Sequence, residues 1–293
     1  MAITMHRQPA IAGRTGIGLR LPHLAEVVAT RPNVGWLEIH PENFLANPHA
    51  TELLLDLARD YPISVHTVGI SIGSAEGIDV AHLKRLHAFI ERLNPALVSG
   101  HLAWSTEDGA YLNDLLPLPY DEDTLRVVAD HLMRVQDWIG RAYVIENPSS
   151  YVGFANSTMT ELEFLAALVH RTGCRLLCDV SNVYVSGHNM GYDPYAYLNN
   201  FPAGAVAELH LGGFTAEDDD ATPGATLLVD THAAVVTEPV WDLYAHAVRL
   251  FGPQPTIVEW DSDIPAIATV IDEATRADAE RDRIREAQHA GAS

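Results

Sequence analysis

The chain has 293 residues, 47% of them hydrophobic, which is enough to bury a full core as either two small domains or one α/β barrel. Lys and Arg number 18 against 39 Asp and Glu, and a formal net charge of -21 argues against nucleic acid as a partner because it repels a phosphate backbone. The sequence holds no apolar run of about 18 residues, and the opening MAITMHRQPAIAGRT lacks a signal-peptide core. We therefore expect a cytoplasmic protein with no membrane partner.

Short β-rich runs alternate with amphipathic helical stretches about every 30 residues, which is typical of a parallel sheet. In chain order the runs are Gly16–Arg20, Gly35–His40, Ile63–Val68, Leu97–Leu102, Tyr143–Asn147, Arg175–Val180, Val206–Leu211 and Thr256–Trp260. Eight runs favour closure into a barrel. The sequence therefore predicts an α/β fold, a single (β/α)8 TIM barrel over residues 1–274, followed by a charged C-terminal tail or helix over residues 275–293.

Several segments between the strands have the apolar stripe of a helix packed on a sheet. They are Asp79–Leu93, with Asp79 as N-cap, Asp123–Ile139, Thr160–Thr172 and Glu238–Phe251. The acidic run Glu217–Asp220 is predicted to be a solvated surface loop. Cys174 and Cys178 lie four residues apart on one face of a predicted strand, too far apart for a disulfide, so we expect two buried, unreactive thiols.

Histidines and carboxylates recur at or just after the carboxyl ends of the later strands. These candidate metal ligands are His66, His101, Glu146, Asp179, Asn182, His210, Asp230, His232 and Glu259. In a closed parallel barrel they converge on the mouth, where barrel active sites lie. Carboxylates gathered there would repel one another unless cations neutralised them, and a nitrogen and oxygen ligand set without cysteine suits zinc, manganese or non-heme iron. Nine ligands exceed the needs of one ion, so we expect two or three ions, with Glu146 as a central bridge.

Other side chains are expected near the same mouth. Four belong to the segment around HPENF, after the second strand: Glu38, His40, Glu42 and Asn43. Glu42 and Asn43 are candidates for substrate binding, with ordinary loop structure as the alternative. Trp104 and Tyr184 lie next to proposed ligands and would either wall a substrate pocket or simply pack. Asp261, two residues beyond Glu259 on the same side of its strand, is a candidate catalytic residue for proton transfer, or else a brace for the ligands.

Eight ordered motifs span the chain from Gly16 to Pro265: WLEIHPENF, SVHTVGISIGS, SGHLAWS, IENPSSY, CDVSNVYVSGHN, ELHLGG, VDTH and IVEWDSDIP. Together they resemble the multinuclear non-heme iron-dependent oxidative enzyme family, typified by the methanobactin-biosynthesis oxidase, whose barrel is similar to that of the xylose isomerase and apurinic endonuclease superfamily. The resemblance implies three ion sites. The first would use His66, His101 and Glu146, the second Glu146, Asp179, His210 and Glu259, and the third Asn182, Asp230 and His232. Asn182 stands where the trizinc endonuclease has a histidine, and it is a weaker ligand.

The same resemblance implies a reaction. It points to an O2-using oxidation of cysteine residues in a ribosomally synthesised precursor peptide, as a step in natural-product maturation. Two or three iron ions in mixed Fe(II)/Fe(III) states would be the cofactor, with zinc or manganese as metals that the purified protein could hold. Members of that family act with a partner protein that delivers the leader of the peptide, so we expect such a partner here.

Three other functions are compatible with parts of the sequence. A hydrolase of the apurinic-endonuclease type would use the same metal cluster to activate water, but 18 basic residues among 39 acidic ones do not form the basic face that DNA requires. A two-metal sugar isomerase or epimerase would use the same barrel, although the ligand pair of VDTH favours a third site. A non-catalytic metal-storing or scaffold protein is the remaining alternative.

Overall fold

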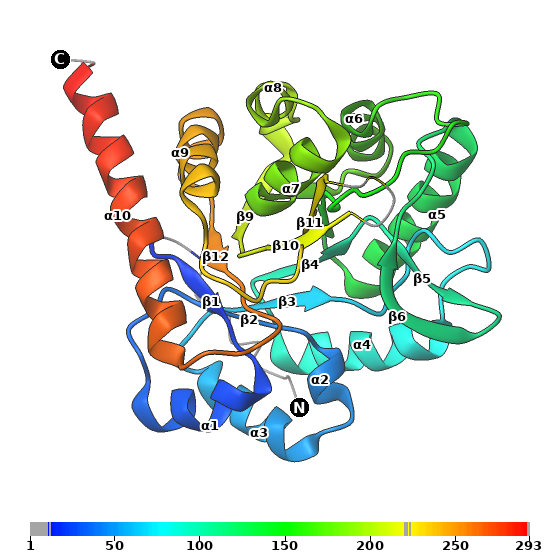
Figure 1. Cartoon of the computed structure of the whole chain (residues 1–293). Helices are drawn as coiled ribbons and strands as arrows, with labels where there is room; N and C mark the ends of the chain where they lie inside the picture. The colour runs from blue at the N-terminus through cyan, green and yellow to red at the C-terminus, as the bar shows by residue number, and fades with distance from the viewer. Residues whose placement is uncertain (1–10, 12, 220–221, 223, 292–293) are drawn as a thin grey trace.

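The computed structural model describes residues 11, 13–219, 222 and 224–291, and its centre is a closed barrel of eight parallel strands (Figure 1). Around the barrel the strands are β1 (Gly16–Gly18), β12 (Thr256–Val258), β9 (Val206–Leu211), β8 (Arg175–Asp179), β7 (Val144–Glu146), β4 (Leu97–His101), β3 (Ile63–Thr67) and β2 (Leu37–Ile39). Each coincides with one of the eight predicted runs, some of which extend a few residues beyond the observed strand. The predicted (β/α)8 fold is confirmed.

Helices surround the barrel and pack their apolar stripes on the outer face of the strands (Figure 1). All four predicted helices form, and their caps explain where they begin: the Asp79 side chain accepts from two backbone N–H groups of α4, and Thr160 forms a capping box with Glu163 in α6. The helices are α1 (Leu21–Thr30), α2 (Glu42–Leu45), α3 (Pro48–Leu57), α4 (Val80–Leu93), α5 (Glu122–Ile139), α6 (Glu161–Thr172), α7 (Val180–Met190), α8 (Pro194–Asn200), α9 (Glu238–Phe251) and α10 (Ile267–Gly291).

The register of neighbouring strands decides which polar side chains meet inside the barrel. His101, the last residue of β4, pairs with Glu146, the last residue of β7. Asp179, the last residue of β8, pairs with His210 in β9. Laterally paired residues project to the same side of a sheet, so the register brings four candidate ligands to one end of the barrel interior.

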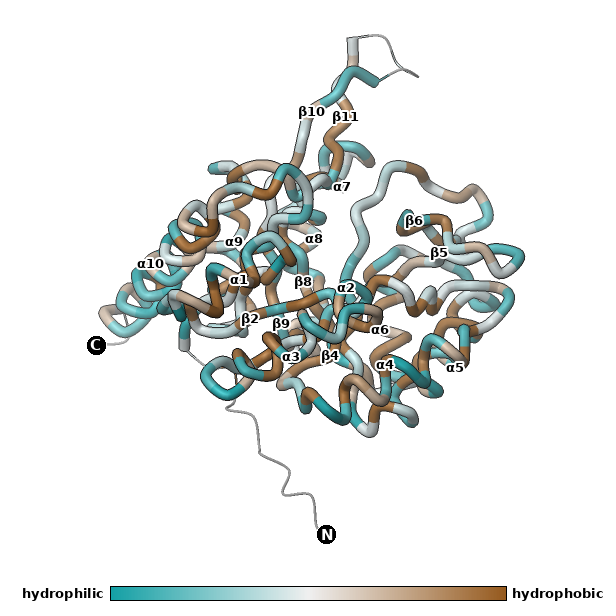
Figure 2. Tube along the Cα trace, turned by 90° about the horizontal axis from the view of Figure 1, so that it is seen from below, coloured by the Kyte–Doolittle hydropathy of each residue, from teal (hydrophilic) through white to brown (hydrophobic). Residues whose placement is uncertain are grey.

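Two β-hairpins rise from the loops at the carboxyl end of the barrel, and neither follows from the strand pattern of the sequence. One joins β5 (Trp104–Glu107) and β6 (Ala110–Leu116) after β4, and the other joins β10 (Thr215–Asp218) and β11 (Thr226–Val229) after β9. Figure 2 shows the β10–β11 hairpin projecting from the body of the molecule. The prediction of a loop at Glu217–Asp220 is wrong for residues 217 and 218, which pair with β11, and residue 220 lies outside the described residues.

Helix α10 runs past the expected domain boundary at residue 275 without interruption. Ala277, Arg281 and Ile284, beyond that boundary, are buried. The side chain of Asp278 accepts hydrogen bonds from both the backbone N and the Oγ1 of Thr15, each at 2.7 Å. The helix therefore packs beside the start of β1, and its buried residues continue as far as Ile284 (Figure 1).

Both cysteines are buried and free, as predicted. Burial, followed by the negative charge of Asp179, raises the pKa of Cys178 well above its ordinary value, so its thiol is unreactive. Of the helices that the described residues form, none is long and apolar enough to cross a membrane.

Candidate metal centre

Two histidines and one glutamate meet at the carboxyl ends of β3, β4 and β7. Nε2 of His66 lies 3.0 Å from Nε2 of His101, and these two nitrogens lie 3.2 and 3.4 Å from Oε2 of Glu146. Nδ1 of His101 lies 3.2 Å from the carbonyl oxygen of Thr67, which can only accept, so neutral His101 turns a lone pair on Nε2 toward the other two atoms. Ligand atoms that share one ion at about 2.1 Å lie roughly 3–3.5 Å apart. These three atoms have the spacing of one metal site.

A second group extends from Glu146 across β8 and β9. Glu146, Asp179 and His210 each offer a ligand atom within 4.8 Å of the others. Nδ1 of His210 also lies 2.9 Å from Oε2 of Glu259. Oδ1 of Asp179 accepts from the backbone N of Asn182 at 2.7 Å and caps α7, which leaves Oδ2 free to face the group. Glu146 therefore borders two adjacent groups of ligand atoms, as a bridging carboxylate must.

A third group forms around His232. Its Nε2 lies 2.8 Å from Oδ1 of Asp230 and 3.8 Å from Oδ2 of Asp179. Asp179, His232 and Glu259 also offer ligand atoms within 4.8 Å of one another. The third group thus shares Asp179 with the second, and the structure brings eight of the nine predicted ligands into one continuous cluster.

The ninth predicted ligand, Asn182, lies against that cluster. Its Nδ2 donates to Oε1 of Glu146 at 3.2 Å and to the carbonyl oxygen of Asn147 at 3.1 Å. Its Oδ1 is buried and meets no hydrogen-bond donor. The amide nitrogen therefore fixes the side chain while the oxygen, the atom that can bind a cation, stays available.

The cluster contains more buried polar atoms than hydrogen bonds can satisfy. The atoms that face the cluster and meet no hydrogen-bond partner are Glu146 Oε2, Asp179 Oδ2, Asn182 Oδ1, Asp230 Oδ1 and His232 Nε2. Leaving such atoms buried and unpaired is costly, and a bound cation is the usual reason for the arrangement. Because all of them are oxygens or imidazole nitrogens, the donor set fits iron, zinc or manganese.

The pKa values of the cluster show how it would balance its charge without metal. Burial, followed by repulsion from Glu146, raises the pKa of Asp179 to about 7. Burial lowers the pKa of His66, but the close contact with the Glu146 carboxylate and the charge of Glu38 outweigh it and raise the pKa to about 9. Protons thus neutralise in the metal-free protein what cations would neutralise in the loaded one.

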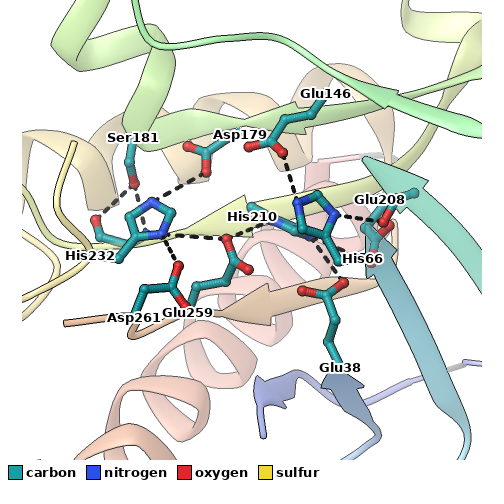
Figure 3. Close-up of polar contacts among 12 residues, drawn as sticks. Glu38, His66, Glu146, Asp179, Ser181, Glu208, His210, His232, Glu259 and Asp261 are labelled. Atoms are coloured by element: carbon teal, nitrogen blue, oxygen red, sulfur yellow. Dashed lines mark hydrogen bonds and ion pairs between the residues drawn. The ribbon is translucent and has the colours of Figure 1, made fainter. Parts of the chain in front are cut away.

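Arg20 and His232 together hold Asp261, and Figure 3 shows the contact with His232. Nε and Nη2 of Arg20 donate to Oδ1 of Asp261 at 2.5 Å and to Oε1 of Glu259 at 3.1 Å. Oδ2 of Asp261 lies 3.0 Å from Nδ1 of His232, which places the imidazole proton on Nδ1 and turns Nε2 toward Asp230. Burial raises the pKa of Asp261, but the charge of Arg20 outweighs it, and the pKa lies well below its ordinary value.

The backbone near His232 is constrained. His232 has a φ of 44°, in the left-handed region that side chains rarely adopt. A Cβ at Gly212 would lie 2.3 Å from Cδ2 of His232, so the ring needs a glycine at that position. The Ser181 hydroxyl accepts from the Gly212 backbone N and donates to its carbonyl oxygen, both at 2.8 Å, and fixes this close approach.

Beneath the ligands, two further carboxylates face His210 inside the barrel (Figure 3). Nε2 of His210 lies 3.5 Å from Oε2 of Glu38 and 3.6 Å from Oε1 of Glu208. Both glutamates are fully buried, and none of their four oxygens has a hydrogen-bond partner. His210 therefore has Glu259 at Nδ1 and this pair at Nε2, and carboxylates of this kind orient metal-binding histidines.

The cluster opens into a cavity of about 480 Å³ at the barrel mouth. Glu146, Asn182, Asp230, His232 and Glu259 contribute to its wall, together with the apolar side chains of Val68, Ala103 and Leu115. Asp261 lies on the same wall, but Trp104 and Tyr184 do not line it. Trp104 donates to the Pro117 carbonyl oxygen at 2.9 Å and borders a different cavity, and Tyr184 stacks on Phe214. Glu42 and Asn43 line an adjoining cavity.

The sequence matches, over residues 14–281, the family described as RiPP precursor modification enzyme MbnB/TglH/ChrH, whose substrates are precursors of ribosomally synthesised, modified peptides. The chain belongs to this family. Curated relatives are UPF0276 proteins. One from Vibrio parahaemolyticus is 47% identical over 264 residues, covering 89% of this chain and 90% of the relative. One from Rhizobium meliloti is 46% identical over 259 residues, covering 87% of this chain and 82% of the relative.

Solved structures share the fold of this family member. An L-ribulose 3-epimerase has a TM-score of 0.61 and 15% identity, with 96% of this chain and 99% of the epimerase covered. A xylose isomerase-like TIM barrel protein from Mycobacterium smegmatis, in complex with magnesium, has a TM-score of 0.57 and 14% identity, with 89% and 88% covered. At such identities the likeness shows the xylose isomerase-like barrel and nothing about the reaction.

Sequence reasoning overlooked two residues that this RiPP precursor modification enzyme brings to the cluster. Glu208 lies two residues before His210, and a charged residue on the inward side of an otherwise apolar strand was the available signal. Arg20 lies 241 residues from Asp261 in the chain, and only the closure of the barrel between β1 and β12 brings them together.

Proposed function

We propose that this enzyme is an O2-using, multinuclear iron-dependent oxidase that modifies cysteine residues of a ribosomally synthesised precursor peptide. The observation that carries the proposal is the sharing of carboxylates between three groups of ligand atoms, with Glu146 common to the first two and Asp179 common to the second and third. Such sharing suits two or three adjacent ions better than one. Membership of the RiPP precursor modification family supports the peptide substrate.

Different residues of this chain would hold each of the ions. His66, His101 and Glu146 would hold one ion, and Glu146, Asp179, His210 and Glu259 a second. Asn182, Asp230 and His232 would hold a third, beside Asp179, which the second and third groups share. Bound iron would supply acidification of the substrate thiol and a binding place for O2.

Asp261 has two candidate roles, and its contacts favour one of them. Arg20 and His232 both engage its oxygens, and its lowered pKa makes it a weak base. We therefore propose that Asp261 positions His232, and that proton transfer, the role predicted from the sequence, requires one of these two contacts to open first.

A partner protein that delivers the leader of the peptide belongs to the same proposal. The loop after β7 contributes Pro148 and Ser149 to the cavity wall and then exposes Tyr151, Val152 and Phe154. Exposed apolar side chains grouped beside a catalytic cavity are typical of a protein contact surface. We place the partner there.

The experiment that tests the function combines anaerobic iron loading with mass spectrometry. The enzyme is loaded with Fe(II), exposed to O2 and incubated with cysteine-containing peptides and candidate partner proteins that are encoded near its gene. We expect a mass change confined to cysteine-containing fragments. Glu146→Gln should abolish the change, whereas Glu26→Gln, on the exposed side of α1, should retain it. An unchanged peptide with a full iron complement and O2 present would contradict the proposal.

The alternatives have less support. A net charge of -21 disfavours a DNA-cleaving hydrolase. Nicking of abasic DNA by the metal-loaded protein would be the result that supports this alternative. The sugar epimerases among the structural neighbours share only the fold, at 15% identity or less. Conversion of a ketose to an aldose, or epimerisation of a ketose, by the manganese-loaded protein would be the result that favours a sugar isomerase or epimerase.

A further inference from the structure

A second cavity continues the metal cavity outward along strand β6. It has a volume of about 510 Å³, and His40 and Val68 line both cavities. Tyr111 and Asn113 of β6 line the outer cavity, and Leu115 lines the metal cavity. Strand β6 therefore borders both cavities. We call the two cavities together the groove, which starts at the ligand atoms and leads away from them.

The hairpin that carries β6 is fixed to the barrel. The carboxylate of Glu76 accepts from the backbone N of Asp108 at 2.6 Å and of Gly109 at 3.4 Å, both in the hairpin turn. At the other end, the Ser71 hydroxyl accepts from the backbone N of Ser105 at 2.8 Å. The wall of the groove is therefore formed before any peptide arrives, which lowers the entropic cost of binding.

Strand β6 is irregular where it passes from one cavity to the other. Tyr111 pairs with Thr106, and Leu116 pairs with Trp104, so five residue steps in β6 face two in β5. Asn113, at the centre of this bulge, has a φ of 51°. Bulges bend a strand and redirect its side chains, and they are common beside active sites. From Tyr111 to Leu115 the strand spans at most about 13 Å, the length of three to four extended peptide residues.

The outer cavity offers groups that suit a peptide. Asn43 and Asn113 present amides that can donate to and accept from a peptide backbone. The charged side chains in the same wall are Glu42, Asp79 and Arg85, two negative and one positive. The ring of Tyr111 is 49% exposed above them. Burial of the hydroxyl and the nearby charge of Glu42 raise the pKa of Tyr111, so the phenol stays neutral and can donate a hydrogen bond.

We propose that this groove binds, in extended form, the three to four residues that flank the modified cysteine on one side. Tyr111 and Asn113 contact those residues, while the cysteine side chain passes Leu115 into the metal cavity. The inference rests on the proposed function, because it takes a cysteine-containing peptide as the substrate. It adds a specificity-determining surface on β6 to the metal centre.

The test uses cobalt(II)-loaded enzyme under anaerobic conditions, because a thiolate bound to cobalt gives a charge-transfer absorption band and cobalt(II) leaves the peptide unchanged. The probes are N-acetylcysteine amide and two peptide series, in which one to four Leu, Ala and Ser residues are added on the N-terminal or the C-terminal side of a single cysteine. We expect one series to bind about tenfold tighter than N-acetylcysteine amide once three or four residues have been added. One aromatic contact can contribute a gain in affinity of this size.

Variants then assign the gain to β6. Tyr111→Ala should remove most of the gain while leaving both the cobalt content and the affinity for N-acetylcysteine amide unchanged. Leu112→Ala is the matched control, because Leu112 is 40% exposed on the same strand and lines neither cavity, and it should keep the gain. Asn113→Gly retains the left-handed backbone without the amide, so its smaller loss, about threefold, provides a second measurement if Tyr111→Ala fails to fold.

Two results would overturn the assignment of the groove alone, and a third would also contradict the proposed function. Equal affinity for every peptide and for N-acetylcysteine amide, or an equal loss in Leu112→Ala and Tyr111→Ala, would exclude the groove and leave the thiolate site standing. The absence of a thiolate band with every probe would count against the proposed function itself, and the groove assignment would fall with it.

Discussion

Nε2 of His66 and Nε2 of His101 lie 3.0 Å apart, and Oε2 of Glu146 approaches both. Two imidazole nitrogens lie this close when one of them carries a proton or when both bind the same cation. The first state describes the metal-free protein, in which His66 has a raised pKa of about 9. The second describes the loaded enzyme, and the same three atoms serve both states.

Replacing His101 by alanine should remove one bound ion and leave the fold intact. The side chain ends at the cavity and contributes a ligand rather than core packing. Metal content per chain after anaerobic iron loading, measured by elemental analysis, is expected to fall by one equivalent, with an unchanged far-UV circular dichroism spectrum. His170→Ala, on the exposed side of α6, should keep the full content, and equal contents in the two variants would argue against His101 as a ligand.

Asn182→Ala should empty the third site alone. Asn182 Oδ1 is the buried, unpartnered atom of that side chain, whereas the first two groups of ligands do not need it. We expect the iron content to fall from three equivalents to two. The loss of the hydrogen bonds to Glu146 and Asn147 should also lower the free energy of unfolding by about 1–3 kcal/mol. A variant that retains every ion would show that Asn182 is no ligand.

Glu208→Gln should weaken the second ion. If His210 binds metal through Nδ1, beside Glu259, then its Nε2–H points to Glu38 and Glu208. Removing the charge of such a partner typically lowers metal affinity by about 10–100-fold. Competition with a chelator of known affinity measures the metal affinity, and one ion per chain should show the decrease. Glu217→Gln, on exposed strand β10, is the control, and identical affinities in both variants would refute the orienting role.

The metal-free enzyme should lose stability as the pH rises from about 6.5 to about 9. Folding raises the pKa of His66 from 6.5 to about 9, so its contribution is fully present below pH 6.5 and is lost as the pH rises through 9. The difference corresponds to about 3 kcal/mol at most. The pKa values of His210 and His232 are also raised, so they act in the same direction. Thermal unfolding of chelator-treated protein measures the effect.

The metal-loaded enzyme is the comparison for that pH series. Histidines bind metal as neutral ligands, so bound zinc should keep the melting temperature nearly constant over the same range. His66→Gln should reduce the fall seen without metal. A metal-free melting temperature that stays level or rises between pH 6.5 and 9 would be inconsistent with a protonated His66 held by Glu146.

The sequence was sufficient to predict the barrel, because eight short β-rich runs recur along the chain and four of the segments between them have the apolar stripe of a helix. It also placed His66, His101, Glu146 and Asp179 at strand ends, where they are found. The pairing of His101 with Glu146 depends on the stagger between β4 and β7, which no local pattern records. For the same reason Arg20 could not be connected to Asp261 before the first and last strands of the barrel were seen to pair.

The hairpin β5–β6 had a local signal that was not used. Asp108 and Gly109 form its two-residue turn, with φ values of 49° and 72°, and an Asp-Gly pair between extended segments is typical of a type I′ hairpin turn. The bulge at Asn113 had no such signal, because β6 bends there to follow the cavity. Trp104, predicted to lie at the mouth, is instead held by Pro117 at the base of this hairpin.

The central claim is that several iron ions share Glu146 at the barrel mouth. Anomalous diffraction at the iron absorption edge from crystals of the anaerobically iron-loaded enzyme tests it most directly. We predict at least two iron peaks, one bound by His66 and His101 and one by Asp179 and His210, with Glu146 coordinating both. A single peak, or peaks that lie away from Glu146, would contradict the account.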